Sequence, residues 1–76
     1  MNIQVLGTGC AKCTQLAQLT TQAVAELGID ADITKVTDLK QIMALGAMMT
    51  PALAIDGVVK VAGRVPSPEE LKKLLA

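Results

Sequence analysis

The chain has 76 residues, of which 51% are hydrophobic and 18% are charged, and seven basic side chains balance seven acidic ones. This length predicts one small domain, residues 1–76, and the hydrophobic fraction is too high for a disordered chain. The balanced charge argues against nucleic acid as a partner, because proteins that bind it carry an excess of basic side chains. No apolar segment is long enough to span a bilayer, so we expect no direct membrane insertion.

Phe, Tyr, Trp and His are absent from the sequence. The chain therefore lacks the usual general base, the commonest metal ligand and aromatic surfaces on which nucleic-acid bases stack. No basic stretch followed by a hydrophobic core marks a signal peptide, which favours a cytoplasmic location. In the reducing cytoplasm a lone pair of cysteines is more often catalytic or metal-binding than structural.

The first part of the chain predicts a buried strand followed by a long helix. The short apolar run over residues 3–6 ends at Gly7-Thr8-Gly9, which is typical of a strand that leads into a turn. Apolar residues recur at helical spacing over residues 11–27, and Gly28 is suited to end that helix.

A second strand and a second helix are predicted next. Residues 29–34 alternate between apolar and polar side chains, which indicates a half-buried strand near a sheet edge. Asp38 and Gln41 resemble a capping box that begins a helix, and Gly46 is expected to end it.

The last third of the chain predicts a hairpin and a terminal helix. Pro51 introduces a strand over residues 52–55, and Asp56-Gly57 favours a tight turn into a returning strand over residues 58–62. Ser67-Pro68-Glu69-Glu70 then combines an N-cap serine, an early proline and first-turn acids, which begins a third helix.

The predicted order is β-α-β-α-β-β-α. Two strands joined by a helix are expected to be parallel with a right-handed crossover, whereas the final hairpin is antiparallel. The sequence therefore predicts an α/β fold with a four-stranded mixed sheet flanked by three helices.

The only two cysteines, Cys10 and Cys13, lie where the first strand gives way to the first helix. Unpaired backbone amides at the helix start near Ala11, the helix dipole and the charge of Lys12 would all stabilise a thiolate there. The small residues Gly7 and Gly9 leave space around Cys10 for an approaching sulfur. We therefore predict thiol–disulfide exchange, with Cys10 attacking a substrate disulfide and Cys13 resolving the mixed disulfide. A redox-active Cys10–Cys13 disulfide would be the only redox group, with no cofactor and no metal.

These features resemble the thioredoxin-like family, and in particular its minimal redox-active disulfide proteins of the thioredoxin-3 type. The resemblance rests on Cys10-Ala11-Lys12-Cys13 after the first strand, on Thr50-Pro51 before the third, and on the terminal hairpin and helix. It implies a thioredoxin-like fold and a cis peptide bond before Pro51, which is where cis bonds occur in proteins. It also implies that the backbone of Thr50 pairs with the substrate chain.

The same resemblance extends the predicted substrate groove beyond Thr50 and Pro51. Gly9 and Met49 are expected to line it, and Gly63 to lie on its far rim. Met48 and Met49 have adaptable side chains that suit a docking face for varied partners. The implied partners are disulfide-containing proteins and an electron-donating reductase, and we expect the chain to be a monomer.

Several positions depart from the family's patterns. Gly9 stands where thioredoxin has an aromatic residue, Ala11 and Lys12 replace Gly and Pro, and Gln4 replaces a buried acid. Gly63-Arg64 stands in the region of the paired-glycine motif with which glutaredoxins hold glutathione, so glutathione binding has little support. Arg64 is interpreted as a solvated loop charge, with an acidic partner as the alternative.

Two other functions remain open from the sequence. Heavy-metal-associated domains also carry two cysteines after a first strand, and two thiolates suit Cu(I). Those domains have a Met where Thr8 stands here, and they end on a strand. An interaction module with a vestigial cysteine pair is the other alternative. Lys12 itself is read equally well as a thiolate-tuning cation or as an ordinary solvated side chain.

Overall fold

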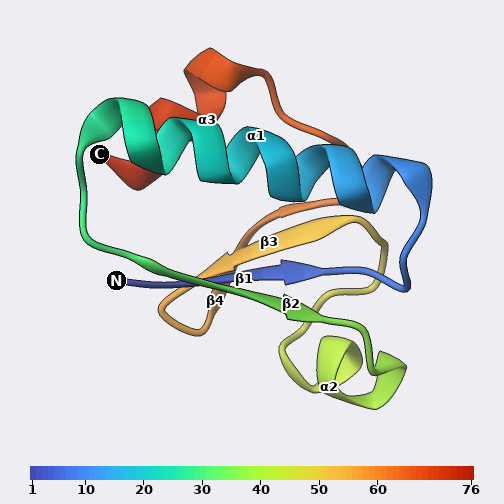
Figure 1. Ribbon diagram of the computed structural model, residues 1–76. Coiled ribbons are helices and arrows are strands. Elements are labelled where there is room, and N and C mark those ends of the chain that lie inside the picture. Colours follow the sequence, from blue (N-terminus) through green and yellow to red (C-terminus); the bar gives the residue numbers. More distant parts are fainter.

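The computed structural model describes residues 1–76, and it shows a sheet with helices on both faces (Figure 1). None of its helices combines the length and the apolar character of a transmembrane segment. The elements follow the predicted order and are β1 (Asn2–Leu6), α1 (Ala11–Leu27), β2 (Asp32–Val36), α2 (Leu39–Ala44), β3 (Ala52–Ile55), β4 (Val58–Ala62) and α3 (Pro68–Leu75).

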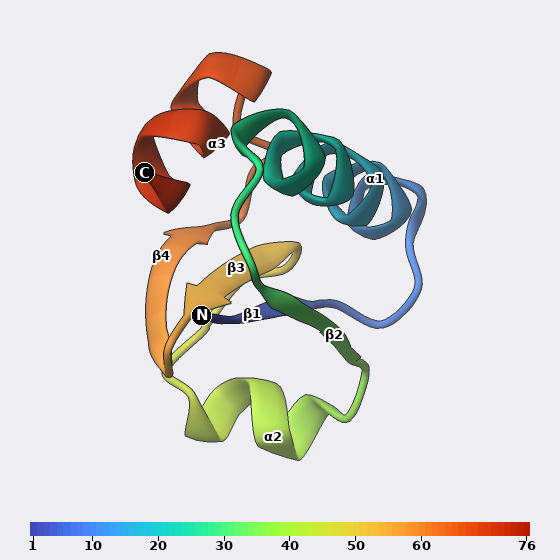
Figure 2. The same cartoon turned by 60° about the vertical axis from the view of Figure 1, so that its left-hand side comes forward.

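The four strands form one mixed sheet in the order β2-β1-β3-β4. β1 pairs in parallel with β2 and antiparallel with β3, and β3 pairs antiparallel with β4. Helices α1 and α3 cover one face of the sheet and α2 covers the other, as the turned view shows (Figure 2). The predicted thioredoxin-like α/β fold is therefore confirmed, because order, strand directions and helix number all agree.

The start of β2 differs from the prediction, which was residues 29–34. Gly28 takes a left-handed conformation with φ 64°, and the amides of Gly28 and Ile29 donate to the carbonyls of Ala25 and Val24. Ile29 therefore belongs to the closing hydrogen bonds of α1 rather than to a strand. Sheet bonding begins where the Asp32 amide donates to the Met1 carbonyl at 2.9 Å, so the strand starts later and reaches Val36.

Helix α2 begins at the predicted cap but without the predicted capping box. The Asp38 carboxylate accepts from the Lys40 amide at 2.9 Å, so it caps the second helical residue rather than Gln41. The helix ends at Ala44, and Gly46 follows with φ 95°. The positive φ explains why a glycine is suited to the position just beyond this short helix.

The hairpin between β3 and β4 turns as its sequence predicts. Asp56 and Gly57 have φ values of 52° and 85°, the pattern of a type I′ turn. The Asp56 carboxylate also accepts from the Asn2 amide at 2.8 Å, which attaches the turn to the start of β1. A register shift in β4 leaves Lys60 unpaired between Val59 and Val61, which bends the edge strand.

The core consists of two clusters, one on each face of the sheet. Residues two apart in a strand point to the same face, so Leu53 and Ile55 belong to one cluster while Ala52 and Ala54 belong to the other. The larger cluster lies between the sheet and α1 and α3, and the smaller lies between the sheet and α2. Leucine and isoleucine fill the larger one because the chain has no aromatic residue to do so.

Replacing Leu71 with Ala tests the larger cluster. Leu71 is fully buried between α3 and the sheet, so we expect Leu71→Ala to lower the free energy of unfolding by about 2–5 kcal/mol. Urea denaturation followed by far-UV circular dichroism measures it, since the chain has no Trp. The matched control is Leu39→Ala, whose side chain is 57% exposed and should cost less than about 1 kcal/mol. Equal losses in both variants would contradict this description of the core.

Candidate active site

Several strand ends meet at one edge of the sheet. Leu6 at the end of β1 pairs with Val36 at the end of β2 and with Ala52 at the start of β3. Ala52 in turn pairs with Ala62 at the end of β4. The loops that leave these strands, including the one with both cysteines, are therefore brought together by the register of the sheet.

The cysteine pair forms a disulfide at the start of α1. Cys10 is the N-cap residue, and its sulfur accepts from the Cys13 amide at 3.1 Å. Cys10 is exposed, whereas Cys13 is only 5% exposed. Ala11 and Lys12 lie exposed on the same first turn, and the amide that bonds to Cys10 is that of Cys13 rather than Ala11.

The two glycines before the pair do different things, which the sequence did not distinguish. A Cβ atom on Gly7 would overlap the Cys13 sulfur and lie 2.9 Å from its Cβ, so Gly7 makes room for Cys13 rather than for Cys10. Gly9 has open space around it and a φ of 93°. A glycine directly after a buried strand and before a cysteine pair was the available signal for the role of Gly7.

The peptide bond between Thr50 and Pro51 is cis, as the resemblance implied. Pro51 is buried and Thr50 is exposed. Because Ala52 pairs with Leu6, Pro51 leaves the sheet beside Gly7, which itself contacts Cys13. The cis bond and the disulfide therefore belong to the same edge of the molecule.

Gly63 and Met49 lie against each other at this edge. The Gly63 amide donates to the Pro51 carbonyl at 2.9 Å. A Cβ on Gly63 would lie 3.2 Å from the Cβ of Met49 and 3.3 Å from its sulfur, so the Met49 side chain rests on the Gly63 backbone. The structure thus brings together Pro51, Met49 and Gly63, three of the residues predicted for the substrate groove.

Gln4 lies on the α2 side of the sheet, away from the larger cluster. It lines a cavity of about 340 Å³ together with Val36, Gln41, Ala44 and Leu45. This cavity has no titratable side chain. No group of three or more His, Cys, Asp or Glu side chains is arranged to hold a metal ion.

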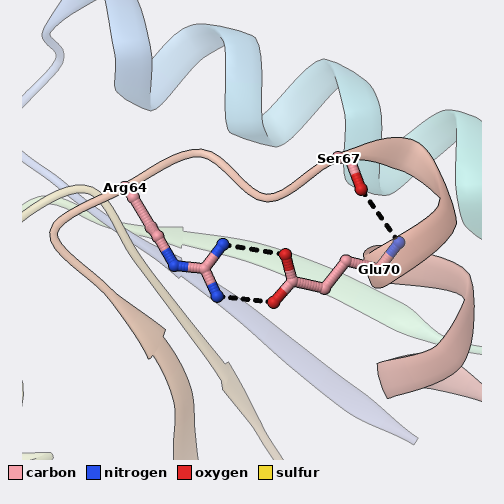
Figure 3. Close-up of polar contacts among 3 residues, drawn as sticks. All are labelled: Arg64, Ser67 and Glu70. Atoms are coloured by element: carbon pink, nitrogen blue, oxygen red, sulfur yellow. Dashed lines mark hydrogen bonds and ion pairs between the residues drawn. The ribbon is translucent and has the colours of Figure 1, made fainter.

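Arg64, next to Gly63, pairs within the chain rather than standing free. Its guanidinium donates two hydrogen bonds to the Glu70 carboxylate, at 2.8 and 2.5 Å (Figure 3). The Ser67 hydroxyl accepts from the Glu70 amide at 3.2 Å, so a cap and an ion pair fix the loop between β4 and α3. The hydrogen bonds and charge of Arg64 lower the pKa of Glu70, and Glu70 raises the pKa of Arg64.

Comparison with known proteins finds one family model and several relatives that match all or nearly all of the chain. A family model described as "Thioredoxin domain" matches residues 1–76. A protein named Thioredoxin from Methanothermobacter thermautotrophicus is 49% identical over 76 residues, which is 100% of this chain and 99% of the relative. Another protein named Thioredoxin, from Methanocaldococcus jannaschii, is 48% identical over 96% of this chain and 84% of its own length. A third relative, named Probable Thioredoxin, is 35% identical over 93% of this chain and 87% of its own length. It also comes from Methanothermobacter thermautotrophicus.

Adding a methyl group at Gly7 tests its contact with Cys13. We expect Gly7→Ala to displace Cys13, with a loss of about 1–3 kcal/mol in unfolding free energy and a changed Cys10–Cys13 midpoint potential. Denaturation and a redox titration in dithiothreitol buffers measure the two effects. Gly9→Ala is the control, because its added Cβ meets nothing within 4 Å and only the backbone is strained. An unchanged potential in Gly7→Ala would contradict the contact.

Removing the charge of Glu70 tests the ion pair. The folded chain holds the Glu70 pKa below its unfolded value. The ion pair therefore stabilises the fold at any pH above the usual pKa range of Glu, and this contribution is lost as the pH falls through the lowered pKa. We expect Glu70→Gln to be less stable than the natural chain at neutral pH and to approach it in acid. The effect should be small and weaker in salt, since the pair is exposed.

Glu69→Gln is the control for that measurement. Glu69 also lies in the first turn of α3 but has no ion pair with Arg64. Unfolding curves across the acid range for both variants separate loss of the pair from loss of a helix-start charge. The same pH dependence in both would assign the effect to the helix dipole instead.

Proposed function

The chain belongs to the thioredoxin family, and we propose that this protein-disulfide oxidoreductase works as a reductant of protein disulfides in the cytoplasm. The observation that carries the proposal is the disulfide at the start of α1, with an exposed Cys10 and a buried Cys13. The names of the relatives, which match nearly the whole chain, support the same chemistry.

The proposed reaction starts from the reduced pair. The Cys10 thiolate attacks one sulfur of the substrate disulfide, a Cys10–substrate bond forms, and the second substrate sulfur leaves as a thiolate that takes up a proton. Cys13 then loses its thiol proton, and the thiolate that results attacks the Cys10 sulfur and releases the remaining substrate thiolate, which takes up a proton. The substrate gains two electrons and two protons, and the pair ends as the Cys10–Cys13 disulfide.

Burial supports this division of roles. Cys10 is the exposed residue of the pair, so we expect its sulfur to meet the substrate, and Cys13 is buried, so we expect it to react only once the mixed disulfide forms next to it. The Cys13 amide, which donates to the Cys10 sulfur, would stabilise the attacking thiolate together with the helix dipole. Lys12 adds a positive charge on the same exposed turn, and Ala11 is the first residue of the helix whose amides favour the anion.

The proposed substrate groove runs past the cis bond. Thr50 is exposed and lies outside the strands, so its backbone is suited to pair with an extended substrate chain, because β-like hydrogen bonding needs unpaired backbone groups. Met49 and Gly63 would form the adjoining rim, and Gly9 would leave the approach to Cys10 open. The Pro51 carbonyl accepts a hydrogen bond from the Gly63 amide, which joins the two sides of this surface.

A dithiol donor must restore the reduced pair after each cycle. We expect that donor to be a reductase, with disulfide proteins as the substrates. A reductant should have a Cys10–Cys13 midpoint near about −270 mV, whereas an oxidant lies near about −120 mV. Titration in dithiothreitol buffers, read by the mass shift on thiol alkylation, measures it. A midpoint at the oxidising end would reverse the proposed direction of electron flow.

Nothing in the structure favours the two alternative functions, a copper carrier or a non-catalytic interaction module. Heavy-metal-associated domains have the order β-α-β-β-α-β, whereas the order here is β-α-β-α-β-β-α. Retention of Cu(I) by both thiols without a clean redox couple would move the assignment to a metal carrier. An interaction module would bind partners equally well when both cysteines are replaced.

Replacing each cysteine with serine separates the two roles. We expect Cys10→Ser to abolish turnover, because the attacking sulfur is gone, and Cys13→Ser to accumulate a mixed disulfide that cannot be resolved. Disulfide reduction assays and intact mass of the trapped species measure these outcomes. Thr21→Ser, further along α1, is the control and should keep normal turnover. Full turnover by Cys13→Ser would show that the division of roles is wrong.

A further inference from the structure

Four of the six large apolar side chains that the fold leaves exposed gather on one part of the surface, on α2 and the segment that leads to Pro51. The most exposed is Met48, at 92%, which a stability role does not explain. Near these residues lies a cavity of about 210 Å³, which we name the α2 groove; its lining residues are Leu39, Ile42, Met43, Ala47, Met48 and Thr50.

The α2 groove adjoins the cis peptide bond before Pro51. Thr50 lines the groove and is joined by the cis bond to Pro51. Pro51 leaves the sheet next to Gly7, which contacts Cys13, because Ala52 pairs with Leu6. A substrate chain that pairs with Thr50 while its sulfur reaches Cys10 therefore lies beside the opening of the groove.

We propose that the α2 groove binds one large apolar side chain, such as Phe, that lies close in sequence to the cysteine of the substrate. This inference rests on the proposed function and adds a sequence preference to it. The groove then acts as a specificity pocket for an extended segment, beside the point where the disulfide is exchanged.

The chemistry of the lining selects this occupant. None of the lining residues is charged, so the groove offers nothing to pair with a charged side chain. Its volume suits one side chain, whereas a stable interface with a folded partner covers about 800 Å² on each side. Met43 and Met48 have flexible thioethers that contact aromatic rings favourably, in a chain that has no aromatic residue of its own.

Disulfide-closed peptides test the preference directly. The peptides are identical except for one residue near a cysteine, which is Phe or Ser at successive positions on either side. Each is mixed with the reduced protein in single-turnover experiments, and the reduced peptide is measured by mass spectrometry after acid quenching. At the best position we expect the Phe peptide to react about tenfold faster at low concentration, because burying a Phe side chain is favourable by at least the about 1.4 kcal/mol to which tenfold corresponds.

Variants of the groove assign the preference to its residues. Met43→Gln and Met48→Gln should bring the Phe-to-Ser rate ratio close to one. Val58→Thr is the control, because Val58 is also exposed but lies beside the hairpin turn at the other end of β3, and it should keep the tenfold ratio. The midpoint potential of each variant is measured to separate binding from changes in redox chemistry.

The outcomes distinguish this inference from the proposed function. Reduction of all peptides at equal rates by the natural chain would overturn the pocket and leave the reductant intact. No reduction of any peptide, with a normal redox couple, would overturn the proposed function itself. A concentration-dependent dimer in sedimentation, lost in Met43→Gln, would assign the groove to a second copy of the chain and also overturn the pocket.

Discussion

The pairing of Leu6 with both Val36 and Ala52 is the constraint on which the site depends. It aligns the end of β1 with the end of β2 and the start of β3, and through Ala52 with the end of β4. A shift by one residue would turn Leu6 and Ala52 to the wrong face and move Pro51 away from Gly7. The hydrophobic alternation that builds the two core clusters therefore also fixes where the cysteine loop meets the cis proline.

The site uses a difference in burial between two residues that lie only one helical turn apart. Cys10 stands outside the first turn as its cap, and Cys13 points inward against Gly7. The absence of a side chain at Gly7 is what allows the second sulfur to be buried there. One helix start thus supplies an accessible sulfur, a shielded sulfur and an amide that bonds to the accessible one.

The two faces of the sheet carry core clusters of different size. The face under α1 and α3 holds the larger side chains and the main core, and α3 is attached by the Ser67 cap and the Arg64–Glu70 pair. The face under α2 holds the smaller cluster, in which three of the six buried residues are alanines, and the short helix leaves Leu39 and Met43 exposed. The larger cluster packs against the helix that carries the disulfide, while the face with the smaller cluster presents exposed apolar side chains on α2.

Local sequence determined the elements, because each depends on neighbouring residues: Gly28 ends α1, Asp56-Gly57 turns the hairpin and Ser67 caps α3. It also identified the cysteine pair, since spacing and helix position are local properties. The sequence alone did not determine the start of β2. The amide of Ile29 donates to the Val24 carbonyl of α1 instead of joining the sheet, and the alternation of apolar and polar residues does not distinguish these two possibilities. Only the tertiary structure decided that Gly7 accommodates Cys13, that Gly63 supports Met49 and bonds to Pro51, and that Arg64 pairs with Glu70. The contacts of Gly63 join loops distant in sequence, and the register of the folded sheet brings those loops together. Gly7 and Cys13 are close in sequence, and so are Arg64 and Glu70, but each of these contacts depends on how the intervening turn folds.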